Sequence, residues 1–108
     1  MANQFTSYVS KDVGTSPASI LTVGANTQTT LIGLSCANTT QSPVTVDAYV
    51  TRSAVNYYLI KGAVVPVGGS LVIVGGDQKV VVIPSDILKV VSSDAASVDV
   101  FASVLNIT

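Results

Sequence analysis

The stretch that decides the fold is "LVIVGGDQKVVVIPSDILKVVS", residues 71–92. It holds three valine-rich runs, separated by Gly-Gly-Asp-Gln and by Pro-Ser-Asp. Branching at Cβ stiffens a side chain and suits the pleated surface of a strand, whereas glycine, proline and aspartate favour turns. We therefore predict three consecutive antiparallel strands, with a hairpin turn at residues 75–78. Pro84 should end the second strand, because proline cannot donate to a central ladder.

The first two runs, "LVIV" and "KVVVI", are apolar at consecutive positions and therefore on both faces of a strand. Such strands are either central in a two-layer core or covered by another subunit. We expect that the side chains buried inside the subunit include members of the set Val72, Val74, Val81 and Ile83.

The rest of the chain repeats this layout of short runs between turn residues. Two runs alternate with a period of two, which places every second residue on a half-buried face. Their inward positions are Val44, Val46, Ala48 and Val50, and Val98, Val100, Ala102 and Val104. In "TLIGLSCA", the same pattern sends Ile32, Leu34 and Cys36 to one face. These features predict an all-β fold for residues 1–108, a single antiparallel β-sandwich domain, immunoglobulin-like or jelly-roll-like, with about seven to nine short strands.

Charge is scarce in this chain. Charged residues make up 10% of it, against roughly 25% in an average soluble domain, while hydrophobic residues make up 48%. Two interpretations remain open: neighbouring subunits cover much of the surface, or serine and threonine side chains solvate it. The formal net charge is −1, and the five cations are spread along the chain. Because counterion release requires a basic face, we predict no nucleic-acid partner.

The residues that usually carry catalysis are few. Histidine is absent, and Cys36 is the single cysteine, which excludes an intramolecular disulfide. We interpret Cys36 as a small buried residue. The aspartates are interpreted as caps in turns (Asp77, Asp86 and Asp94) or as side chains on polar strand faces (Asp47 and Asp99). We therefore predict that the chain is no enzyme, and that it has no catalytic, cofactor-binding or metal-binding residues.

The N-terminal stretch "MANQFTSYVSKDVG" lacks the basic end and the apolar centre of a signal peptide. No uninterrupted apolar run reaches the roughly 20 residues of a membrane-spanning helix. We expect synthesis in the cytoplasm without a signal peptide, and no membrane partner.

Adjacent tyrosines stand in "VNYYLIKG". On a strand, Tyr57 and Tyr58 point to opposite faces, so that one ring can enter the core while the other remains at the surface. Tyrosine is enriched at protein interfaces because it combines a large apolar body with a polar tip. We therefore select Tyr57, Tyr58 and Phe101 as candidate interface residues. A platform on which a sugar stacks is the alternative interpretation of the tyrosines.

The C-terminal half, residues 56–107, carries a series of short motifs. They are a tyrosine, an apolar pair and a lysine (58–61), "PVGGSL" (66–71), "KVVV" (79–82), "DILKVVS" (86–92) and "ASVDVFASVL" (96–105). This series resembles a family of small β-rich virion structural proteins of tailed bacteriophages, of the neck, collar, tail or head-decoration type. Ser85 stands where the family pattern has glycine, and Asn106 where it has an acidic residue.

The resemblance implies a non-enzymatic structural protein of a tailed-phage virion, present in many copies at the head–tail neck or collar or in the tail. Two alternatives remain open: a capsid decoration (cement) protein, and a carbohydrate-binding β module for host-surface recognition. The implied partners are copies of the chain itself in a homo-oligomer, and neck, tail or major capsid proteins. The implied location is the virion, after synthesis in the host cytoplasm.

Overall fold

The computed structural model describes residues 3–75 and 78–107, and these form nine β-strands without a helix. The strands are β1 (Asn3–Val13), β2 (Ala18–Thr22), β3 (Gln28–Asn38), β4 (Val44–Arg52), β5 (Val55–Val65), β6 (Ser70–Val74), β7 (Val80–Val82), β8 (Ile87–Ser92) and β9 (Val98–Ile107). The predicted all-β fold is confirmed. Nowhere in the described part of the chain is there a helix able to cross a membrane.

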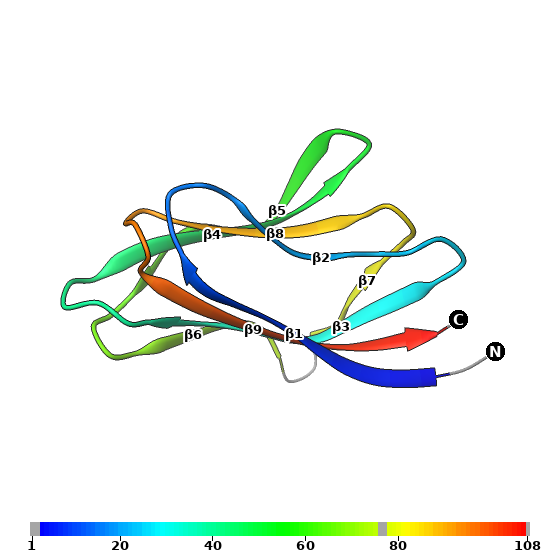
Figure 1. The fold of residues 1–108 in the computed structure, drawn as a ribbon, viewed down its shortest axis with the longest axis horizontal. Helices are drawn as coiled ribbons and strands as arrows, with labels where there is room; N and C mark the ends of the chain where they lie inside the picture. Colours follow the sequence, from blue (N-terminus) through cyan, green and yellow to red (C-terminus); the bar gives the residue numbers. More distant parts are fainter. Residues whose placement is uncertain (1–2, 76–77, 108) are drawn as a thin grey trace.

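Two antiparallel sheets face each other as the layers of a sandwich (Figure 1). The first sheet has the order β1-β9-β3, and both β6 and β7 pair with the far side of β3. The second sheet has the order β2-β8-β4-β5. When β6 and β7 are counted as one interrupted strand, this is the pair of four-stranded sheets found in a jelly roll. Of the two predicted topologies, the jelly-roll-like one therefore applies.

The hydrophobic core lies between the two sheets, and the period-two pattern places its residues correctly in β4 and β9. All eight predicted inward residues of these strands are buried. The prediction for β3 is wrong at one position, because the pairing of β3 with β9 shifts register between Leu31 and Gly33. This bulge places Leu31 in the core, beside the correctly predicted Leu34 and Cys36, and leaves Ile32 only partly buried.

The predicted hairpin between the two valine runs is wrong. Strand β6 pairs with Leu34–Ala37 and β7 with Thr29–Leu31, so the two lie end to end along β3 instead of pairing with each other. The third predicted strand, β8, belongs to the second sheet, where it lies between β2 and β4. Of the predicted turn, Gly76 and Asp77 lie outside the described residues. Because β3 is 11 residues long, it can pair with both short strands.

The edge position of β6 and β7 explains the burial of their valines. Val74 is 1% exposed, so the expected set does contain a core residue, but Val72 is 65% exposed. Val81 and Ile83 are exposed as well. These runs are apolar on both faces, as the sequence indicates, yet only one face is covered within the subunit. The other face belongs to an open surface of the first sheet.

Candidate assembly surface

The outer face of the first sheet carries apolar side chains in a row across four strands. Val100, Ala102 and Val104 of β9 point into the core, so Phe101, Ser103 and Leu105 point outward. Phe101 lies opposite Val9 of β1 on one side and Ser35 of β3 on the other, and Ser35 lies opposite Val72 of β6. Directly opposed side chains of an antiparallel sheet lie on the same face. Three of these four are large exposed hydrophobic residues.

A second apolar row runs parallel to the first. Leu105 lies opposite Phe5 of β1 and Thr30 of β3, and Thr30 lies opposite Val81 of β7. Phe5 and Val81 are exposed, and Leu105 is partly buried. We call the surface made by Phe5, Val9, Val72, Val81, Phe101 and Leu105 the apolar face. An exposed apolar surface of this kind typically marks an interaction site.

Small residues separate the two apolar rows. Ser103 lies opposite Ser7 of β1 and Gly33 of β3. Over β1 and β9, these small side chains leave a groove between the two apolar rows. The bulge in β3 inserts the partly buried Ile32 beside Gly33, so the groove ends at β3.

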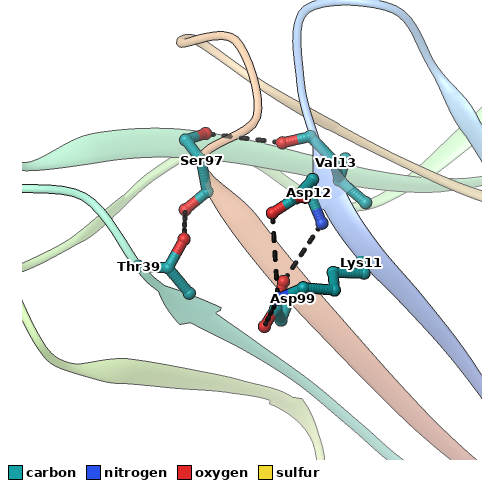
Figure 2. A network of polar contacts seen from close by, with 6 residues as sticks. All are labelled: Lys11, Asp12, Val13, Thr39, Ser97 and Asp99. Atoms are coloured by element: carbon teal, nitrogen blue, oxygen red, sulfur yellow. Dashed lines mark hydrogen bonds and ion pairs between the residues drawn. The ribbon is translucent and has the colours of Figure 1, made fainter.

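One end of the apolar face is polar, and Figure 2 shows the contacts that Lys11, Asp12 and Asp99 make there. Asp12 has a positive φ of 57°, at the point where the pairing of β1 with β9 shifts. Its backbone N donates to Asp99 Oδ1 over 3.0 Å, and Lys11 Nζ lies 3.5 Å from Asp99 Oδ2. Beyond this point, Ser97 N donates to the carbonyl of Val13. The charged side chains of β1 and β9 thus gather at this end, where Lys11 lies beside the carboxylates of Asp12 and Asp99.

A depression of about 360 Å³ lies where the polar end meets the first apolar row. Its lining includes Val9, Lys11, Ser35, Asp99 and Phe101. The predicted interface residue Phe101 therefore stands beside a hollow on an otherwise apolar surface.

The two predicted tyrosines lie elsewhere, on the hairpin of β4 and β5 that rises from the body of the molecule (green in Figure 1). Tyr57 is 57% and Tyr58 45% exposed, so the expectation that one ring enters the core is wrong. The hairpin rises away from the first sheet (Figure 1), so neither ring lies between the two sheets. The Tyr58 ring packs 4.9 Å from the ring of Tyr49, with Lys61 Nζ 4.4 Å from its centroid.

The structure does not bring the three candidate residues together, because Phe101 belongs to the first sheet and the tyrosines to the second. The partners of Phe101 on the apolar face were missed from the sequence. Phe5 and Val9 stand in "NQFTSYVSK", where the spacing of large apolar residues gives a weak signal. The sequence pattern instead predicts Val72 and Val81 as core candidates.

A second cavity, of about 400 Å³, lies between the β4–β5 hairpin and β7. Its lining includes Arg52, Tyr57, Leu59 and Val81. The guanidinium of Arg52 is bound to Asp86: Nε lies 2.9 Å from Oδ1, and Nη2 lies 2.6 Å from Oδ2. This cavity is therefore mostly apolar, with a compensated charge at one side.

The carboxylate residue Asp86 is deeply buried, at 1% exposure. Besides Arg52, it accepts a hydrogen bond from the backbone N of Ile83 over 2.9 Å, so its predicted role as a turn cap is confirmed. The hydrogen bonds from Arg52 hold the pKa of the Asp86 carboxyl below its usual value, against the opposing effect of burial. Within residues 3–75 and 78–107, no group of three or more metal-ligating side chains comes together.

Cys36 is buried between the sheets, as the sequence predicts. Burial disfavours the thiolate and raises the pKa of the Cys36 thiol to about 11. Because the thiolate is the reactive form, this side chain is protected both from reagents and from disulfide exchange.

No protein-family model matches the sequence, and no curated protein matches it. Solved structures of other proteins share the fold, and two of them are the following. One is a protein of Bacillus endospore appendages, described as disulfide-linked pili, with a TM-score of 0.58 and 16% identity over 99% of this chain and 87% of that chain. The other is a protein of the infectious bursal disease virus particle, with a TM-score of 0.60 and 8% identity. The alignment covers 96% of this chain and 30% of the viral one, and at these identities the likeness concerns the fold alone.

Proposed function

We propose that this chain is a non-enzymatic structural subunit of a tailed-phage virion, present in many copies at the head–tail neck or collar or in the tail. The observation that carries the proposal is the apolar face. Covering exposed apolar surface is worth about 25 cal/mol for each Å² removed from water. Because only 10% of the residues are charged, electrostatic repulsion between copies of the chain is weak.

Two further observations support this function. The motifs of residues 56–107 resemble virion proteins of tailed phages. The solved structures with the same fold belong to pili and to a viral particle, and both are assemblies of many subunits. The capsid decoration protein remains the alternative location, with the apolar face then held against a major capsid protein.

The contacts of this subunit would be non-covalent. The related pili are described as disulfide-linked. Cys36 is the single cysteine here and is fully buried, so it reaches a neighbour only if the sandwich opens.

We expect the protein to co-purify with the particles of the phage that encodes it, and to remain bound after a high-salt wash. Screening weakens exposed ion pairs but leaves apolar burial intact. Quantitative mass spectrometry of washed particles gives the copy number, and electron microscopy of gold-labelled particles gives the position. Label at the neck or tail supports the proposal, label over the head supports decoration, and absence of the protein from washed particles refutes both.

A carbohydrate-binding module is the second candidate, because exposed Tyr57 and the Arg52 guanidinium line the same cavity. An aromatic face beside fixed polar groups is a common design for a small-molecule site. If this function holds, Tyr57→Ala should abolish binding on a glycan array. The control, Phe101→Ala, changes an aromatic residue of similar exposure on the other sheet and should leave glycan binding unchanged. Glycan binding that both variants retain would exclude this cavity.

A further inference from the structure

The relief of the apolar face matches a second copy of itself. Rows of side chains on one face of a strand are roughly 7 Å apart, so the two apolar rows stand about 14 Å apart with the small row between them. Stacked sheets pack roughly 10 Å apart with their side chains interdigitated. A ridge such as Phe101 therefore needs a groove on the opposite surface, and Ser7 and Ser103 supply one over β1 and β9.

The size of the apolar face is sufficient for a stable pair. It is four strands wide, and β1 extends it from Asn3 to Lys11. With strands roughly 4.8 Å apart and a rise of roughly 3.4 Å per residue, its flat footprint is about 500 Å². The accessible area of a corrugated surface exceeds its footprint, which brings the face close to the roughly 800 Å² per partner of a standard interface.

The distribution of charged residues also favours a second copy of the chain as the partner. The charged groups of β1 and β9 lie at the polar end, where Lys11 and Asp99 are in contact. Between this end and the Phe5 row, the outward side chains of β1, β9 and β3 are apolar or neutral, while the exposed Lys79 stands at the β7 edge. A second copy centred on β1, β9 and β3 would bury no charged side chain of these strands, which avoids the main cost of a poorly matched interface.

We propose that the apolar face packs against the apolar face of a second copy, in a two-fold symmetric pair of sheets. This inference rests on the proposed structural function and names the surface and the partner for it. In such an isologous contact the same residues serve on both sides, which is the commonest symmetry of homo-oligomers. Phe101 of one copy then lies over the Ser103 row of the other, so the two-fold axis passes between these two rows.

Three valine variants test the surface. Val9 and Val72 lie on the apolar face and are 67% and 65% exposed, whereas Val64 lies on β5 of the other sheet and is 61% exposed. Val9→Asp and Val72→Asp should each raise the dissociation constant of the pair at least about thirtyfold, because each buries an unpaired carboxylate. Val64→Asp should change it less than about twofold. Sedimentation velocity over a concentration series measures this constant, and circular dichroism checks that each variant is folded.

A cross-link tests the geometry. Ser103→Cys places a thiol beside the expected axis, and the buried Cys36 should not react. Sheets stacked roughly 10 Å apart hold facing Cα atoms beyond the roughly 7 Å that a disulfide spans, so the reagent is a short bis-maleimide. It should join two copies of Ser103→Cys much faster than two copies of Thr45→Cys, which carries its thiol on an exposed strand position of the second sheet. Adding Phe101→Asp to Ser103→Cys should suppress the cross-link.

The inference is overturned if the wild-type chain stays monomeric over the whole series, or if Val9→Asp and Val72→Asp act no more strongly than Val64→Asp. The proposed function is judged separately, on washed particles. If the Val72→Asp protein enters particles at the wild-type copy number, the proposed pairing of apolar faces is overturned. The proposed structural function is then unaffected. A chain that pairs through this face but is absent from particles overturns the structural function alone.

Discussion

Replacing Val74 by alanine should lower the free energy of unfolding by about 2 kcal/mol, whereas the same replacement at Val72 should change it by less than about 0.5 kcal/mol. The two valines belong to one short strand, yet Val74 is 1% exposed and Val72 is 65% exposed. Truncating Val74 removes buried methyl groups and leaves a cavity between the sheets. Truncating Val72 removes only contacts with water when the subunit is alone.

Denaturant unfolding measures both values, at a concentration where the subunit is monomeric. The midpoint of Val74→Ala should fall while the slope of the transition stays the same. Val72→Ala is the matched control, because it changes the same residue type on the same strand. Equal losses at both positions, or a larger loss at Val72, would mean that the covered face of β6 is not the one described.

The period-two pattern predicted the inward residues of β4 and β9 because alternation depends only on the local backbone. Any extended strand sends successive side chains to opposite faces, whatever its partners. The same rule failed in β3, where one extra residue between Leu31 and Gly33 reverses the phase. A bulge is fixed by the pairing with another strand, and the sequence of β3 alone does not reveal it.

The choice of strand partners could not be read from the sequence. The runs around residues 75–78 have the spacing of a hairpin, and a local hairpin has the lower entropic cost of closure. In the fold, β6 and β7 both pair with β3, whose paired residues lie between 33 (Ala37 and Ser70) and 53 (Thr29 and Val82) positions earlier in the chain. Long-range pairing prevails because it continues the first sheet across the core and buries Val74 and Val82.

The candidate interface was predicted only in part for the same reason. Phe101 was selected from the sequence, and it lies on the apolar face. Its neighbours Val9 and Val72 come from the first and sixth strands, and only the register of three strand pairs puts them in one row. Asp86 was likewise recognised as a turn residue, but its partner Arg52 lies 34 positions away on a different strand.

Replacing Asp86 by asparagine should lower the free energy of unfolding at neutral pH by about 2 kcal/mol. The asparagine side chain has nearly the same shape as aspartate, and its oxygen can still accept the hydrogen bond from Ile83 N. Its amide group cannot replace a carboxylate that Arg52 contacts through both Nε and Nη2. In a double-mutant cycle, Arg52→Met and Asp86→Asn together should lower the free energy of unfolding by less than the sum of the two single variants. Either change alone already breaks the ion pair, so the second change has no ion pair left to break.

The dependence on pH distinguishes this ion pair from a simple packing effect. Arg52 lowers the pKa of Asp86 in the folded protein, whereas the unfolded chain keeps a value of about 3.9. As the pH falls, the unfolded state therefore takes up this proton first. The stability that the pair supplies is fully present above the unfolded pKa and is lost as the pH falls toward and through the folded pKa. Unfolding measured from about pH 6 down to pH 3 should show wild type losing more stability than Asp86→Asn, so that the difference between them narrows. A difference that stays constant over this range would show that Asp86 acts through its shape alone, and that the bond to Arg52 adds nothing to the fold.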